Sequence, residues 1–308
     1  MGARVVRSGT RGSALARAQS GMMATGLAQA HPEVDIEMIT ISTSGDRTQA
    51  TNQAGADWGT GVFVKEIENA LLREEVDLAV HSLKDVPPVV TAGLILAAIP
   101  VREDPADVLV TSDGRGLQDL APGARVGTTS ARRSAFLRAV RPDLEFAPIR
   151  GNVETRLRKL AEGQYDAIIL ARAGLRRLEL EAAYVVIEPE LLPPAPGQGA
   201  LAIQARAGDR EILELVEPLH DPATAAAARA ERRLMAELEG GCRLPVGALG
   251  TPRQGGELHL LGGLVRDDGT LSVADATGRL DAPEELADQL AVRLRSPGAG
   301  QQRRVVYA

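Results

Sequence analysis

The chain has 308 residues, enough for two or three domains, and 44% of them are hydrophobic, so it can bury substantial cores. Only 2% are aromatic, which means that these cores are mainly aliphatic. The first twenty residues lack the apolar stretch of a secretory signal, and no apolar run reaches the length of a membrane span. We therefore expect a soluble, cytoplasmic, monomeric protein without membrane contacts.

The net charge of −6 is unevenly distributed. Residues 125–177 contain twelve basic and five acidic side chains, so the rest of the chain is strongly acidic. A basic segment in an acidic chain favours a small anionic ligand over polyanions in general. Because no aromatic platform and no nucleic-acid-binding motif accompany these arginines, we do not expect nucleic acid as a partner.

Short β-branched runs alternate with longer amphipathic stretches, a pattern typical of a mostly parallel sheet covered by helices. In the first such region we expect strands at residues 4–7, 35–42, 77–81 and 94–99, with helices at 13–30 and 63–73. The pattern restarts after the turn-rich residues 100–105. There we expect strands at 107–110, 125–127, 145–149 and 167–170, with helices at 131–140, 153–162 and 172–180.

Residues 45–61 interrupt the first region. They are polar, glycine-rich and without periodicity, and they are longer than most connections between elements. An ordinary surface loop would explain them, but their length favours a mobile cover over an active site.

A different unit follows the proline-rich residues 192–199. Asp221 suits an N-cap, Pro222 suits the first position of a helix, and glycines 240 and 241 can end that helix after Glu239. Strands at 246–249, 257–265 and 271–274 and a helix at 283–294 complete a small α+β domain.

Cys242 is the only cysteine, so it cannot form an intrachain disulfide. A lone cysteine is usually a small buried hydrophobe. Here two glycines, an arginine and a proline surround it, which favours an exposed loop, and the neighbouring cation favours the nucleophilic thiolate. Cys242 is therefore the first candidate for covalent attachment of a ligand.

Arginines and hydroxyl groups gather where expected strands meet the helices that follow them. The carboxyl ends of strands face the ligand crevice in open α/β sheets, and helix N-termini bind anions. The candidate ligands for an anion at these junctions are Arg11, Ser13, Thr128, Ser130, Arg132, Arg133, Arg150, Arg156, Arg176 and Arg177. We interpret Arg138, Arg141, Arg158 and Lys159 as solvated surface charges.

A second polar group follows the strand at 77–81. Lys84 and Asp85 come just before two prolines that stiffen the turn. They can be a surface pair worth only about 0–1 kcal/mol. Alternatively, a carboxylate fixed at the end of a strand suits acid–base chemistry or stabilisation of a cation. The residues alone leave both interpretations open.

Metal and nucleotide sites are not expected. The four histidines are scattered, and the sequence has no HExxH motif, cysteine pair, P-loop, dinucleotide-binding GxGxxG or GxSxG elbow.

A set of short motifs, in order and reaching to about Gly269, resembles the porphobilinogen deaminase family. The motifs are Thr-Arg-Gly-Ser (10–13), Phe-Val-Lys-Glu (63–66), Ala-Val-His-Ser-Leu-Lys-Asp-Val-Pro (79–87), Gly-Thr-Thr-Ser-Ala-Arg-Arg (127–133), Arg-Gly-Asn-Val-Glu-Thr-Arg-Leu (150–157), Tyr-Asp-Ala-Ile-Ile-Leu-Ala (165–171) and Glu-Gly-Gly-Cys-Arg-Leu-Pro-Val-Gly (239–247). The resemblance implies two α/β domains like those of type II periplasmic binding proteins, plus a small C-terminal α+β domain. The first α/β domain would comprise residues 1–100 and 200–218, the second residues 101–199, and the C-terminal domain residues 219–308.

The resemblance also implies a reaction. Cys242 would carry a dipyrromethane cofactor through a thioether, and four porphobilinogen molecules would be condensed onto it with loss of ammonia. Hydrolysis would then release hydroxymethylbilane for haem biosynthesis. Asp85 would be the catalytic residue, because its carboxylate can accept from pyrrole N–H groups and stabilise the cation that forms when ammonia leaves.

The remaining roles implied by the resemblance concern the carboxylate arms of the pyrroles. The cofactor-binding residues would be Ser82, Lys84, Thr128, Ser130, Arg132, Arg133, Arg150 and Arg156. The substrate-binding residues would be Arg11, Ser13, Phe63, Arg150, Arg156 and Arg177. One position departs from many relatives, since Thr60 stands where they have a lysine.

Two other functions are weighed against this one. A non-catalytic, two-lobed binding protein for a polycarboxylate would also place arginines between α/β domains, but it has no use for a thiol on a third domain. A different cysteine-dependent transferase is disfavoured because no motif places a histidine to activate the thiol.

Overall fold

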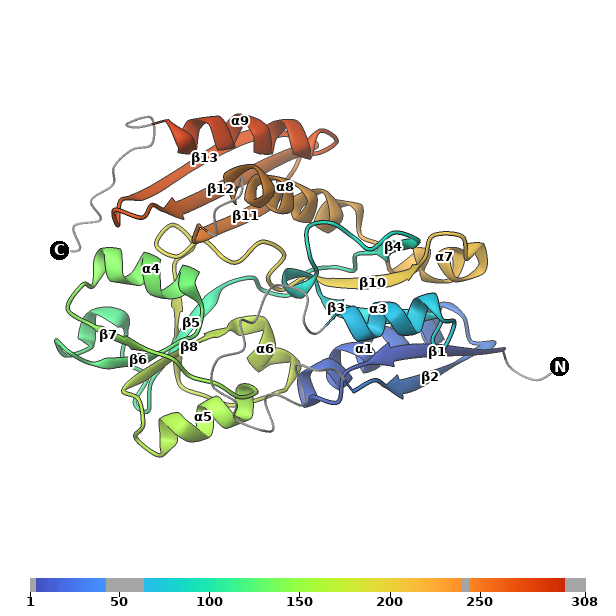
Figure 1. Ribbon diagram of the computed structural model, residues 1–308, viewed down its shortest axis with the longest axis horizontal. Helices are drawn as coiled ribbons and strands as arrows, with labels where there is room; N and C mark the ends of the chain where they lie inside the picture. Colours follow the sequence, from blue (N-terminus) through green and yellow to red (C-terminus); the bar gives the residue numbers. More distant parts are fainter. Residues whose placement is uncertain (1–3, 43–63, 240–243, 297–308) are drawn as a thin grey trace. The chain divides into compact units, whose positions relative to one another are not determined.

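The computed structural model describes residues 4–42, 64–239 and 244–296 (Figure 1). The chain forms two compact units. The first comprises Met1–Glu103 and Gly199–Ala225, and the second comprises Asp104–Gln198 and Ala226–Ala308.

The first unit contains a five-stranded sheet in the order β2-β1-β3-β10-β4. β10 runs antiparallel to both of its neighbours, whereas the β1–β2 and β1–β3 pairs are parallel. Its strands are β1 (Arg4–Thr10), β2 (Val34–Thr40), β3 (Leu78–Ser82), β4 (Leu94–Ala98) and β10 (Leu201–Arg206). Its helices are α1 (Ala14–Ala30), α3 (Lys65–Leu72), α7 (Arg210–Val216) and the 3-10 turns η1 (Leu83–Asp85) and η3 (Glu217–Leu219).

Both faces of β3, the central strand of this sheet, are buried. Val80 on β3 packs in one core with Leu27 of α1 and Leu215 of α7, while the preceding residue, Ala79, packs in another core with Leu71 of α3. Because successive side chains of a strand point to opposite faces, α1 and α7 cover one face and α3 covers the other. This explains why β3 is apolar on both faces.

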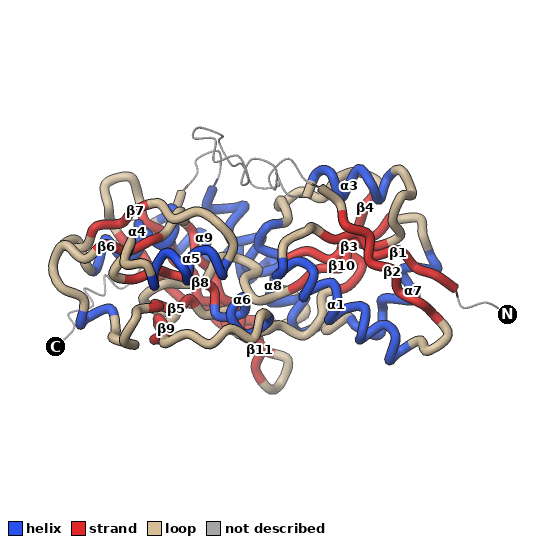
Figure 2. Tube along the Cα trace, turned by 90° about the horizontal axis from the view of Figure 1, so that it is seen from below, coloured by secondary structure: helices blue, strands red, loops and turns tan. Residues whose placement is uncertain are grey.

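The second unit repeats this arrangement in the order β7-β6-β8-β5-β9, with β5 antiparallel to its neighbours. Figure 2 shows the strands of each sheet with helices alongside them. The strands are β5 (Asp107–Val110), β6 (Arg125–Gly127), β7 (Glu145–Ala147), β8 (Ala167–Ala171) and β9 (Tyr184–Ile187). The helices are α4 (Ala131–Val140), α5 (Val153–Ala161), α6 (Arg172–Arg177) and the 3-10 turn η2 (Leu117–Asp119).

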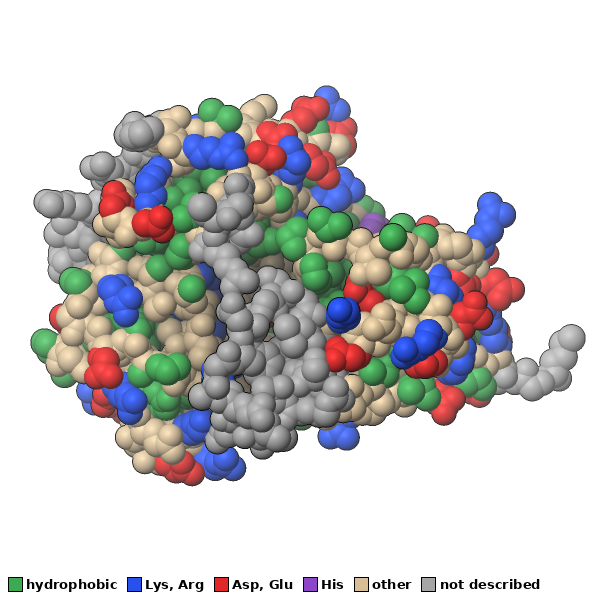
Figure 3. All heavy atoms as spheres, in the orientation of Figure 1, with side chains coloured by type: hydrophobic (Ala, Val, Ile, Leu, Met, Phe, Trp, Pro, Cys, Tyr) green, Lys and Arg blue, Asp and Glu red, His purple; other side chains and the backbone are tan. Residues whose placement is uncertain are grey.

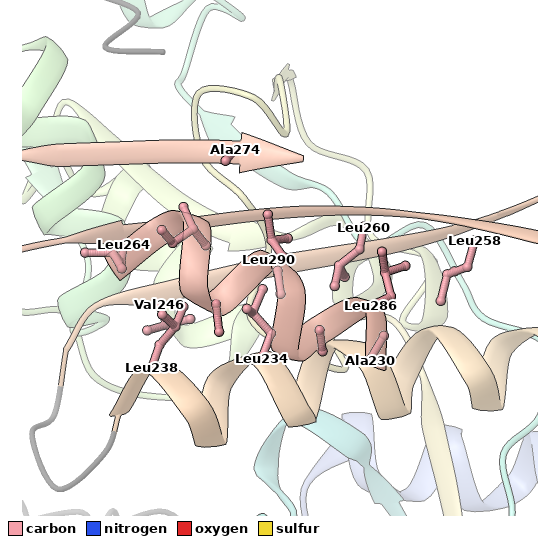
Figure 4. Close-up of a cluster of buried hydrophobic side chains, with 14 of the residues drawn as sticks. Ala230, Leu234, Leu238, Val246, Leu258, Leu260, Leu264, Ala274, Leu286 and Leu290 are labelled. Atoms are coloured by element: carbon pink, nitrogen blue, oxygen red, sulfur yellow. The ribbon is translucent and has the colours of Figure 1, made fainter. Parts of the chain in front are cut away.

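A three-stranded antiparallel sheet in the order β11-β12-β13 belongs to the second unit. Its strands are β11 (Val246–Arg253), β12 (Glu257–Val265) and β13 (Leu271–Arg279), and its helices are α8 (Pro222–Glu239), which begins in the first unit, and α9 (Pro283–Arg295). Leucines of α8, α9 and β12, among them Leu234, Leu290 and Leu260, form a common core (Figure 4). Val265 at the end of β12 instead joins the core around α4.

The predicted fold class is confirmed: two helix-covered, mostly parallel sheets and a small C-terminal sheet. Some predicted elements were wrong in extent. The helix predicted at 172–180 ends at Arg177, since the chain then turns through Glu179 at a φ of 51°. The strand predicted at 271–274 continues to Arg279 because its partner β12 is equally long. β9, β10 and α7 were not predicted as elements.

Candidate functional site

In the first unit, candidate residues lie at the carboxyl ends of β1 and β3. These strands are parallel neighbours, with Ser8 beside Leu78, so the residues that follow them emerge at the same sheet edge. Arg11 follows β1 and is partly buried. Ser13 is the N-cap of α1, and its hydroxyl accepts a hydrogen bond from the Ala16 N–H at 3.3 Å. The Ser13 hydroxyl therefore stabilises the helix start.

The η1 turn after β3 presents Asp85 to solvent. Leu83 is fully buried and its N–H donates to the Ala200 carbonyl on the adjoining chain segment at 3.0 Å. Val86 is also buried. Because Leu83 and Val86 are anchored in the core, Lys84 between them is partly buried and Asp85 is exposed. This arrangement supplies an exposed carboxylate on a rigid base.

Sequence reasoning missed Gln19, which the fold brings to the same sheet edge. Gln19 is buried on α1, and its side-chain amide donates to the Ser82 hydroxyl at 2.9 Å. A glutamine inside an Ala-rich helix carries no motif, so only the packing of α1 against β3 reveals its partner. Gln19 thus orients a hydroxyl predicted to bind the ligand.

A buried polar network lies behind this edge. Glu68 on α3 accepts hydrogen bonds from the Thr91 hydroxyl at 2.7 Å and from the Gln204 amide at 2.9 Å. Burial lowers the pKa of His81 on β3 to about 4, although the charge of Glu68 and the Gln204 amide oppose this. His81 is therefore neutral at physiological pH.

In the second unit, a helix N-terminus faces the end of β6. Ser130 is the N-cap of α4, and its hydroxyl accepts from the Arg133 N–H at 3.4 Å. Thr128 is buried, and its hydroxyl accepts from the Ser130 N–H at 3.1 Å. As predicted from the sequence, this segment joins a strand to a helix start, and its two hydroxyl groups order the turn.

Arg132 and Arg133 are buried at this helix start, each with only 7% exposure. Both pair with Asp107, a fully buried carboxylate on β5: one Asp107 oxygen lies 2.6 Å from Arg132 Nη2, and the other lies 2.6 Å from Arg133 Nη2. Burial alone would raise the pKa of Asp107, but the two guanidinium charges hold it well below its usual range. We name Asp107, Arg132 and Arg133 the cation cluster.

The cation cluster carries more positive than negative charge. One carboxylate faces two guanidinium groups, and the Arg132 Nε–H is buried without an acceptor among the described residues. Arg156 on α5 adds to this excess, since burial and the nearby charge of Arg133 lower its pKa to about 10. Buried, uncompensated positive charge is unfavourable unless an anion offsets it.

The surface differs from this interior. On the face shown in Figure 3, described basic and acidic side chains are interspersed. The buried excess of positive charge in the cation cluster, at the start of α4, is a separate feature from this mixed face.

Arg150 and Arg156 flank the start of α5. Asn152 is the N-cap, and its side chain accepts from the Thr155 N–H at 2.9 Å. Gly151 has a φ of 113°, which side chains rarely adopt, and a Cβ there would lie 2.6 Å from Thr155. Arg150 is exposed and Arg156 Nε donates to the Gly151 carbonyl at 2.9 Å.

Arg176 and Arg177 belong to the last turn of α6. Arg177 is partly buried, and Arg176 lies 3.9 Å from Asp104. Asp104 also accepts from Arg172 Nη1 at 2.5 Å. The structure thus places these arginines on a different element from the cation cluster.

Several predicted residues lie outside the described residues: Phe63, Thr60 and the rest of 45–61, and Cys242. Within residues 4–42, 64–239 and 244–296, no group of His, Cys, Asp and Glu could hold a metal ion. No helix in that same part of the chain is long and apolar enough to cross a membrane.

Comparisons with known proteins agree on one family. Residues 6–214 match the model "Porphobilinogen deaminase, dipyromethane cofactor binding domain", and residues 225–296 match "Porphobilinogen deaminase, C-terminal domain". The porphobilinogen deaminase of Syntrophobacter fumaroxidans is 48% identical over 91% of this chain and 86% of its own length. That of Desulforudis audaxviator is 48% identical over 97% of this chain and 96% of its own length.

Proposed function

The chain belongs to the porphobilinogen deaminase family, and from this membership we propose which of its residues bind and react. Its activity is that of a hydroxymethylbilane synthase, a transferase of tetrapyrrole biosynthesis. Four porphobilinogen molecules are condensed onto a dipyrromethane cofactor with loss of ammonia, and hydroxymethylbilane is then released by hydrolysis.

The chemistry of the second unit fits a dipyrromethane. Each pyrrole of this group bears acetate and propionate arms, so it brings several carboxylates. The cation cluster offers the buried Arg132 Nε–H, which has no acceptor among the described residues, and Arg156 adds a further positive charge. This unsatisfied donor in a cationic interior is the observation that carries the assignment.

We propose that Arg132, Arg133 and Arg156 hold the carboxylates of the cofactor, together with the exposed Arg150 and hydroxyl groups of Thr128 and Ser130. When bound through Cys242, the group supplies the carbon to which the first substrate is joined. Each charge-assisted hydrogen bond to a carboxylate contributes roughly 1.5–3 kcal/mol. Arg133 contributes mainly charge, because its Nε, Nη1 and Nη2 already donate within the protein.

In the first unit we propose that Asp85 is the catalytic residue. Its carboxylate is exposed at the end of the η1 turn, whereas Leu83 within the turn and Val86 directly after it are buried. A carboxylate held this way can accept from the substrate's pyrrole N–H and stabilise the positive charge that develops as ammonia departs. Lys84 on the same turn and Ser82 at the end of β3 would bind the cofactor. Arg11, Ser13 and Arg177 would bind the carboxylate arms of the substrate. Phe63, also proposed to contact substrate, lies outside the described residues.

Asp85→Asn tests this assignment. The variant should fold and carry the cofactor, because Asp85 is exposed and lies in the other unit from the cation cluster. Its turnover should fall by about 100-fold or more, as for loss of one group that stabilises developing charge. Asp35→Asn, an equally exposed aspartate on β2, should leave the rate unchanged. A near-normal rate in Asp85→Asn would remove Asp85 from the mechanism.

A non-catalytic receptor for polycarboxylates is the second candidate and is not favoured, because the family matches extend through the C-terminal domain. We also propose, from the sequence argument, that the protein acts as a cytoplasmic monomer. Sedimentation equilibrium at micromolar concentration and cell fractionation test these two points.

A further inference from the structure

Asp107 is assigned no contact with a ligand above, yet its buried carboxylate accepts from both arginines of the cation cluster and from Gln198. Three arginine N–H groups donate to it: Arg132 Nη2 at 2.6 Å, and Arg133 Nη2 and Nε at 2.6 and 3.0 Å. The Gln198 amide donates to it at 3.0 Å and also reaches the Pro105 carbonyl at 2.7 Å. Asp107 is 0% exposed, and all of these donors come from the protein itself.

We propose that Asp107 is a positioning residue for the cofactor site, which orients Arg132 and Arg133 so that the free Arg132 Nε–H faces an incoming carboxylate. This inference rests on the proposed role of the cation cluster. A guanidinium is planar, so fixing its two Nη groups also fixes the direction of its Nε–H. Without a carboxylate at position 107, two buried like charges would lose their common partner and separate.

The second restraint on Arg132 comes from the small sheet. Arg132 Nη1 donates to the Pro193 carbonyl at 2.6 Å. That carbonyl lies against Gly247 on β11, where an added Cβ would overlap the carbonyl oxygen itself. The next residue, Ala248, donates its N–H to the Pro194 carbonyl at 2.8 Å. Glycine at position 247 therefore allows β11 to pack against the Pro193 carbonyl, which accepts the hydrogen bond from Arg132.

The two restraints hold opposite ends of one guanidinium. Asp107 binds Arg132 Nη2 from β5, and Pro193, seated by Gly247, binds Nη1. Nε is the position that remains without an acceptor among the described residues. The charge of Asp107 also persists across the working pH range, because its pKa lies well below the usual one.

Asp107→Asn tests the inference, since asparagine keeps the shape but removes the charge. The matched control is Asp143→Asn, which removes an exposed carboxylate paired at 2.6 Å with Arg141 at the other end of α4. Each variant is incubated with porphobilinogen, and the folded fraction is isolated by gel filtration. The share carrying the two-pyrrole adduct is then measured by intact mass, and KM and kcat are measured separately.

We expect the folded Asp107→Asn protein to load cofactor poorly and to raise KM by about ten- to hundredfold, the value of one charge-assisted hydrogen bond. Asp143→Asn should match the wild type. A purely structural role would lower only the yield of folded protein. Normal adduct and normal KM in folded Asp107→Asn would overturn the proposal, whereas a wild-type protein without adduct would instead overturn the proposed function.

A second pair of variants addresses the Pro193 restraint independently. Gly247→Ala should displace the Pro193 carbonyl and reduce loading, whereas Gly262→Ala crowds only side chains of the α8–α9 core, such as Leu234. Both should lose thermal stability, but only Gly247→Ala should raise KM. Equal KM values in the two folded variants would contradict the role of Gly247. If Gly247→Ala does not fold, Asp107→Asn decides.

Discussion

The burial of His81 predicts that the fold loses stability at acidic pH. Burial lowers its pKa from 6.5 to about 4, so in the folded protein it stays neutral where the unfolded chain is already protonated. Between these two values the unfolded state binds more protons, and the free energy of unfolding therefore decreases as the pH falls. At about 1.4 kcal/mol per pKa unit, His81 should cost the fold about 3 kcal/mol near pH 4.

The assay compares wild type with His81→Gln, whose side chain does not titrate, in urea unfolding followed by circular dichroism from pH 7 to pH 4. Carboxylates titrate in both proteins, so the informative quantity is the difference between their two pH dependences. Between pH 7 and pH 4, the free energy of unfolding of wild type should fall by about 3 kcal/mol more than that of His81→Gln. The linear extrapolation sets the precision of this comparison. His259→Gln, on the small sheet, is the control. Parallel pH profiles for wild type and His81→Gln would refute the argument that burial controls this histidine.

Three further variants test neighbouring features. Arg156→Leu should leave thermal stability unchanged or raise it, because the variant removes a cation that is disfavoured by burial and by the charge of Arg133. Its KM should rise by about ten- to hundredfold. Reduced stability with a normal KM would contradict this prediction. Gly151→Ala should destabilise the fold by roughly 1–3 kcal/mol in urea unfolding, because its φ is 113°; an unchanged midpoint would show that the backbone relaxes. Cys242→Ser should fold normally by circular dichroism and carry no adduct; a large loss of thermal stability would instead indicate a buried cysteine.

The alternation of short apolar runs and amphipathic helices was sufficient to predict both α/β units. The strands at 107–110, 125–127 and 257–265 and the helices at 131–140 and 222–239 agree with the structure to the residue. The two helices have strong local signals, since each is preceded by a capping residue, Ser130 and Asp221. The strand at 107–110 has a short apolar run, Val-Leu-Val, after Asp107.

The missed elements show two different limits. β9 has only four residues, too few for a clear period, and it is stabilised by pairing with β5. α7 did carry a signal: Asp209 caps it, and Ile212, Leu215 and Val216 recur at helical spacing. Its short length, seven residues, makes that signal easy to overlook.

The site was predictable in its residue types but not in its interior partners. The sequence places Arg132 and Arg133 at a helix start, but nothing local indicates that Asp107, 25 and 26 positions away, binds both. Likewise, Gly247 lies in a predicted strand, and nothing local indicates that the Pro193 carbonyl lies against it. Partners distant in sequence are set by the fold, so they emerge only from the three-dimensional packing.

The measurement that tests the central claim most directly is the intact mass of the purified protein under denaturing conditions, followed by peptide mapping of residues 234–252. We predict a covalent adduct of two condensed pyrrole units on Cys242. If Cys242 is unmodified as purified, and remains so after incubation with porphobilinogen, the chain cannot work as a porphobilinogen deaminase and the anion-binding receptor becomes the better account.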